Sequence, residues 1–166
     1  MAYDPTSWQN FYVMTGGAAA ALTGLLFVAM SLHAKTIMGN NFFRNRAVGT
    51  LTSLATQLLL AGAVLIPGLS LTALGILVEA AALYFLGVTI RAVLTRGPET
   101  ASVQMTWTHR FVEVVGGTTW IVLFNAAGIS LLLRAGGGFY WLAAVMFFMF
   151  GWNIYVAWVL ITEVSE

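Results

Sequence analysis

The sequence lacks cysteine entirely and contains only three prolines, two histidines and few charged residues. Without cysteine, the chain has no disulfide, no thiolate metal site and no cysteine nucleophile. Charged residues make up 8% of the chain, whereas soluble domains carry roughly 25%. Seven basic and six acidic residues nearly cancel, so there is no strong field for binding nucleic acid or an acidic partner. These absences exclude an ordinary soluble domain.

Hydrophobic residues make up 60% of the 166 residues and are concentrated in five long runs. A helix of about 20 apolar residues crosses roughly 30 Å of hydrocarbon. The runs therefore predict an all-α bundle of five transmembrane helices, forming a single domain over residues 1–166. The predicted spans are residues 11–34, 47–66, 69–93, 112–133 and 139–161.

Two of the predicted connections are very short. Pro67 and Gly68 separate the second and third spans, and a helix breaker beside a flexible residue indicates a tight reversal. Arg134 and the glycines at 136–138 separate the fourth and fifth spans, and this glycine run does not extend a helix cheaply. The expected architecture is one single span followed by two helical hairpins.

Basic residues are distributed unevenly between the connections. Short basic segments are retained on the cytoplasmic side of a membrane. Only Arg134 lies on the opposite side, so we expect the N-terminus outside and the C-terminus in the cytoplasm. The other six basic residues flank the first and third connections: Lys35, Arg44, Arg46, Arg91, Arg96 and Arg110.

One ionisable residue, Glu79, lies near the middle of the third apolar run. A carboxyl group at the bilayer centre costs on the order of 2.5 to 3.5 kcal/mol, so it normally faces protein or water and has a function. At about 1.5 Å per residue, Gln57, Asn125 and Asn153 fall at a similar depth in three other runs. The sequence therefore predicts a polar layer near the membrane midplane, centred on Glu79.

This polar layer has three interpretations. It can fix the helix register by hydrogen bonds worth about 0.6 kcal/mol each, with Glu79 permanently protonated. It can line a hydrated cavity or pore in which Glu79 binds or relays a cation or a proton. In the third interpretation, a lipid or another hydrophobic ligand lies between the helices. A glutamine would hold helices without the risk of ionisation, which favours a functional role for Glu79.

Small residues recur at every fourth position of the first run, at Gly16, Ala20 and Gly24. Helices in lipid approach closely where small residues line up, so this pattern predicts a packing face. In the third run, Gly75 lies on the same helix face as Glu79. Because this face contains small residues, we expect the Glu79 carboxyl group to point into the bundle. Because five short helices enclose only a narrow cleft, a pore would need several copies, and we expect a homo-oligomer.

Few residues are available for metal binding or catalysis. His109 and Glu113 are four residues apart, and His33 is expected at the same cytoplasmic edge. Pairs of this kind are common by chance, so we predict no metal site and no cofactor. The sequence contains no catalytic triad, phosphate-binding loop or redox motif. We therefore do not expect an enzyme.

Four parts of the sequence resemble a known group of proteins. The first lies within Trp8–Val28 and includes Phe11, Val13, Gly16, Gly17 and Gly24–Val28. The others are Pro67, Gly137–Trp141 and Trp158–Glu163. They look like the corresponding parts of a widespread group of small bacterial integral membrane proteins that has no established activity. Glu79 resembles a glutamate usual in the third span of that group. The resemblance implies a multi-pass protein of the bacterial cytoplasmic membrane, and it draws attention to Trp158 and Glu163 at the cytoplasmic exit.

The leading expectation is a homo-oligomeric cation or proton channel, or a sensor, whose site is the polar layer around Glu79. The rival expectation is a non-conducting accessory subunit of a larger membrane complex. Such a subunit would bind through the glycine-rich first helix and the cytoplasmic loops at 36–46 and 98–110. The expected partners are the lipid bilayer and further copies of the chain, with no nucleic acid.

Overall fold

The computed structural model describes residues 2–94 and 107–164, and within these ranges the chain is helical with no strand. This confirms the all-α class for the described part. Four helices there are long and apolar enough to cross a membrane, which supports a membrane-embedded protein. They are Pro5–Leu32, Phe43–Leu65, Leu71–Arg91 and Phe139–Leu160, and a shorter apolar stretch covers Thr119–Leu133.

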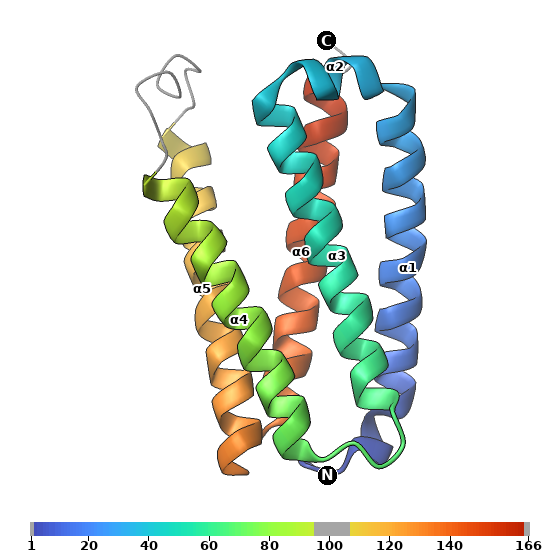
Figure 1. The fold of residues 1–166 in the computed structure, drawn as a ribbon, viewed down its shortest axis with the longest axis vertical. Coiled ribbons are helices and arrows are strands. Elements are labelled where there is room, and N and C mark those ends of the chain that lie inside the picture. Colours follow the sequence, from blue (N-terminus) through green and yellow to red (C-terminus); the bar gives the residue numbers. More distant parts are fainter. Residues whose placement is uncertain (1, 95–106, 165–166) are drawn as a thin grey trace. The chain divides into compact units, whose positions relative to one another are not determined.

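The chain falls into two compact units, of which the first comprises Tyr3–Leu69 and the segment from Met146 onward. In this unit α1 and α3 run antiparallel and pack against each other, with α2 joining them at one end (Figure 1). Ile37 of α2, Ala47 of α3 and Leu160 of α6 form a buried apolar cluster. The elements are η1 (Pro5–Trp8), α1 (Gln9–Leu32), α2 (Ala34–Gly39), α3 (Asn41–Leu65) and most of α6 (Phe139–Val164).

The connection between α1 and α3 is helical, although the sequence predicted a loop at 36–46. His33 (φ −113°, ψ 24°) interrupts the helix after α1, and α2 then ends before Asn40. Asn40 is extended (φ −122°, ψ 118°), and its carbonyl accepts a hydrogen bond from the Arg44 backbone N–H. The second span is therefore part of a helix that begins at Asn41, six residues before the predicted start at 47.

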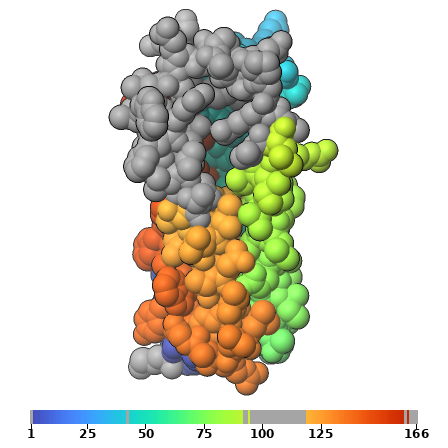
Figure 2. Space-filling model, turned by 90° about the vertical axis from the view of Figure 1, so that its left-hand side faces the viewer, coloured from blue at the N-terminus to red at the C-terminus, as the bar shows by residue number. Residues whose placement is uncertain are grey.

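The second unit comprises Ala2 and Ser70–Val145. It contains α4 (Leu71–Leu94), α5 (Trp107–Leu133) and the beginning of α6. In Figure 2, α4 in green lies beside the part of α5 that is drawn in orange, and the two helices pack against each other. The predicted turns are present, with Gly68 (φ 77°), Gly136 (φ 83°) and Gly137 (φ 105°) in the left-handed region that suits glycine.

Each unit contains one pair of helices that pack extensively against each other. They are α1 with α3 in the first unit and α4 with α5 in the second. Close packing of two helices depends on where a small residue on one helix meets the other helix.

The predicted packing face of α1 meets α3 at Gly16 within the single chain. A Cβ added to Gly16 would lie 3.1 Å from Cβ of Ala61 on α3. Ala20 and Gly24 are exposed, and the buried residues near them are Ala19 and Leu26. Each step of four residues turns a helix by about 40° beyond a full circle, so a strict spacing of four drifts off the contact.

Candidate functional site

Glu79 lies on the face of α4 that packs against α5, and glycines on both helices set the register. A Cβ at Gly75 would lie 2.9 Å from Cγ of Leu132. Glu79 is one turn after Gly75 on α4, and Gly128 is one turn before Leu132 on α5. The Glu79 side chain lies against Gly128. Each helix thus offers a glycine that receives a large side chain from the other. Gly75 and Glu79 therefore both face α5.

The carboxyl group of Glu79 rests directly on the backbone of α5. A Cβ at Gly128 would lie 2.5 Å from Oε1 and 2.7 Å from both Cδ and Cγ of Glu79, so only glycine fits there without a shift. The backbone of Ile129 also contacts the carboxyl group. Oε1 is buried and has no hydrogen-bond partner among the described residues, although the side chain as a whole is partly exposed. One carboxyl oxygen is therefore buried without a polar partner among the described residues.

Asn125 lies on α5, three residues before Gly128. Its Nδ2 donates a hydrogen bond of 2.8 Å to the Ile121 carbonyl of its own helix. The amide nitrogen is therefore used within α5. The sequence predicted that Asn125 and Glu79 belong to one polar layer, and the structure places both in the second unit.

Aromatic rings pack between α4 and α5 beyond Glu79. The Phe85 and Trp120 ring centroids are 4.3 Å apart in an edge-on arrangement, and Trp120 and Phe124 are separated by 5.7 Å. Phe124 is fully buried. Edge-to-face aromatic pairs contribute about 0.5 to 1.5 kcal/mol beyond their buried area, so this cluster holds the two helices together next to the carboxyl group.

The first unit contains the other two residues of the predicted layer, Gln57 and Asn153. Gln57 is 1% exposed, and neither Nε2 nor Oε1 has a hydrogen-bond partner among the described residues. Asn153 on α6 is 3% exposed, and its Nδ2 donates a 3.0 Å hydrogen bond to Ser53 Oγ on α3. Gln57 and Ser53 are one helical turn apart, so they lie on the same face of α3.

The sequence did not single out Gly128, although the Glu79 side chain depends on it. The available signal was a glycine inside an apolar helix, which costs about 1 kcal/mol relative to alanine unless a close approach requires it. Seven other helical glycines in the described part of the chain, among them Gly17, Gly62 and Gly87, have open space where a Cβ would be. Composition alone therefore does not distinguish Gly128 from them.

Of the three weak candidate ligands for a metal ion, only His33 has a described side chain. His33 is exposed, and its Nδ1 lies 3.2 Å from the Ala29 carbonyl oxygen of the preceding turn. The side chains of His109 and Glu113 lie outside the described residues. Among the side chains that are described, no group of three or more potential ligands is present.

Comparisons with protein-family models, with curated proteins and with solved structures found no match to this chain. The fold and the residues of the chain itself therefore carry the argument for its function.

Proposed function

We propose that this protein is a five-span integral membrane protein that binds or passes a cation or a proton at Glu79. The observation that carries the proposal is the Glu79 carboxyl group on the backbone of α5, with one buried oxygen that lacks a partner in the described structure. A carboxylate in apolar surroundings is unfavourable unless a proton or a cation neutralises it. Glycine at 128 makes room for this group at the cost of helix propensity.

Several finer features belong to the same proposal. Gln57, Asn125 and Asn153 are its further polar-layer residues, and a homo-oligomer supplies the pore that one copy is too small to enclose. The basic residues of the first and third connections favour an outside N-terminus and a cytoplasmic C-terminus. The resemblance found in the sequence favours the bacterial cytoplasmic membrane as the location.

Flux through liposomes that contain the purified protein tests this function. We expect flux of protons, sodium or potassium with the wild-type chain and loss of most of that flux with Glu79→Gln, because glutamine keeps the shape but cannot ionise. Ala80→Gln is the matched control, since it places the same amide on the next, exposed position of α4. This control should retain the flux.

Two results would count against the channel. One is the absence of wild-type flux for all three ions, and the other is flux that Glu79→Gln leaves unchanged. A strictly monomeric protein in detergent would also contradict a symmetric pore. Thermal melts provide an independent readout, because a bound cation should stabilise the wild type and not Glu79→Gln.

A non-conducting accessory subunit is the second candidate, favoured by the exposed small residues of α1. Gly17, Ala20 and Gly24 are exposed in the single chain, and a Cβ on either glycine would meet nothing within 4 Å. Because the chain has no cysteine, Ala20→Cys gives a single thiol for oxidative cross-linking. Cross-linked dimers in the membrane would favour the homo-oligomer. Their absence, together with absent flux, would favour the accessory role.

A further inference from the structure

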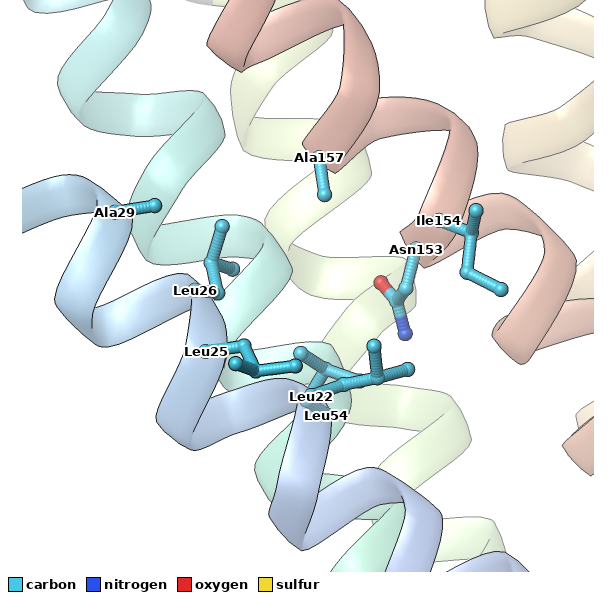
Figure 3. Close-up of a pocket in the computed structure, with 8 residues that line it drawn as sticks. All are labelled: Leu22, Leu25, Leu26, Ala29, Leu54, Asn153, Ile154 and Ala157. Atoms are coloured by element: carbon cyan, nitrogen blue, oxygen red, sulfur yellow. The ribbon is translucent and has the colours of Figure 1, made fainter.

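The first unit contains a cavity of about 150 Å³. Figure 3 shows side chains of α1, α3 and α6 converging on it. Its inner wall includes Leu22 and Leu26 of α1 and Leu54 of α3. Leu26 and Leu54 are 5% and 2% exposed, so this wall is part of the packed interior of the unit.

Asn153 is the only residue with a polar side chain among those lining the cavity. Its amide points from α6 toward the side chains of α1 and α3 (Figure 3). The Nδ2 atom donates to Ser53 Oγ, and Oδ1 is the hydrogen-bond acceptor of the same amide. The Asn153 side chain as a whole is 3% exposed, and a ligand that enters the cavity can donate a hydrogen bond to Oδ1.

The rim of the cavity is apolar and faces outward. Leu25 and Ile154 line the cavity and are 68% and 55% exposed. Both lie on helices that are long and apolar enough to cross a membrane. Asn153 lies within about 5 Å of the middle of its span along the helix axis. The cavity therefore opens toward the lipid tails, far from the headgroups.

From these features we infer that the cavity is a binding site for a small, membrane-soluble aromatic molecule that carries one hydrogen-bond donor, of the phenol class. The ring fills the apolar volume, and its hydroxyl donates to Oδ1 of Asn153. An engineered apolar cavity of about 150 Å³ in another protein holds one benzene molecule, so the size suits a single ring. The ligand enters and leaves through the lipid-facing rim between Leu25 and Ile154.

Two other occupants fit the cavity less well. A lipid acyl chain fills apolar volume but offers no donor to the Asn153 oxygen at this depth. A water molecule needs two to four polar partners, whereas the rest of the lining consists of leucine, isoleucine and alanine side chains. A ring with one hydroxyl satisfies both the apolar wall and the acceptor.

The site can be tested in lipid nanodiscs by fluorine NMR with two probes of matched shape, 4-fluorophenol and 4-fluorotoluene. After correction for partition into empty nanodiscs, we expect the phenol to bind the wild type about fivefold more tightly than the toluene, as one added hydrogen bond predicts. Asn153→Leu should abolish this preference while retaining binding of both probes. Ser53→Ala should keep the preference, because it leaves the Asn153 oxygen in place.

Ala157→Leu fills the cavity and should remove binding of both probes. Ala144→Leu, the same change at an exposed position of α6, should leave binding intact. Equal affinity for the two probes in the wild type would show an apolar occupant such as an acyl chain and would overturn the phenol site. Binding that survives Ala157→Leu would overturn the location. The lining residues belong to the first unit and Glu79 to the second, so Glu79→Gln should not change probe binding.

Discussion

The two compact units pack their helices with small residues but place different polar groups at the helix contacts. In the first unit Gly16 approaches Ala61, and the buried polar residues Gln57 and Asn153 are neutral. In the second unit a glycine on each helix receives a large side chain, and one of those side chains is the acid Glu79. A neutral amide needs the same partners at every pH, whereas a carboxyl group changes its partners with its charge. The helix contact of the second unit therefore contains a group that can bind a proton or a cation, whereas the buried amides of the first unit stay neutral.

The largest expected effect comes from removing the space under Glu79. Gly128→Ala places a methyl group 2.5 Å from the original position of Oε1. We expect it to destabilise the helix pair by about 1 to 3 kcal/mol, as overpacking usually does. This change in the free energy of unfolding can be measured by unfolding the protein in mixed detergent micelles with an increasing fraction of denaturing detergent.

Gly87→Ala on α4 is the control for Gly128→Ala, because a Cβ there meets nothing within 4 Å. It should be neutral or stabilising by up to about 1 kcal/mol through helix propensity. Adding Glu79→Ala should recover part of the stability lost in Gly128→Ala, because the shortened side chain leaves room for the methyl group. Equal effects of Gly128→Ala and Gly87→Ala would contradict the close contact.

The next largest effect is a difference in stability between variants of the two buried amides of the first unit, Gln57 and Asn153. Both polar atoms of Gln57 lack partners among the described residues, so Gln57→Leu should raise the free energy of unfolding by about 1 kcal/mol. Asn153→Leu removes the hydrogen bond to Ser53 and should lower it by about 0.6 kcal/mol. The same unfolding assay measures both variants. A loss of stability in Gln57→Leu would mean that Gln57 holds a ligand or a buried water molecule.

The smallest effect concerns Asp4, a carboxylate with several partners and therefore the opposite of Glu79. Hydrogen bonds from the Thr6 hydroxyl (2.6 Å), the Ser7 hydroxyl (2.7 Å) and the Thr6 backbone N–H (3.1 Å) lower the pKa of Asp4 from 3.8 to about 2. Because the folded pKa is depressed, the contribution to stability is complete above pH 3.8 and is lost as the pH falls toward 2.

An NMR titration of the Asp4 carboxyl carbon, with hydrogen exchange at the Thr6 amide, follows this transition. We expect faster exchange at Thr6 below pH 3.8 and no change from this group between pH 5 and 8. Asp4→Asn should make the exchange at Thr6 independent of the Asp4 titration. An unshifted pKa near 3.8 would show that the hydrogen bonds to Thr6 and Ser7 do not persist in solution.

The long apolar helices and the two turns could be predicted because they depend on neighbours in the sequence. Pro67 with Gly68, and the glycines at 136–138, lie at helix ends in the structure, and α6 begins at Phe139 as expected. The short helix α2 was missed because the interruption at His33 rests on backbone angles that no glycine or proline marks. Within the candidate site, Glu79 stood out by its charge, whereas Gly128 looked like any other helical glycine.

The sequence by itself determined the helical class, the lengths of the apolar segments and the presence of one acid in the middle of a helix. These follow from local composition and periodicity. Only the tertiary structure decided that Gly16 packs on α3 while Ala20 and Gly24 remain exposed, that Gly128 lies beneath Glu79, and that Asn153 bonds Ser53 beside a cavity. The physical reason is that each of these contacts depends on the rotation and register of helices distant in the chain, which a period of 3.6 residues leaves undecided.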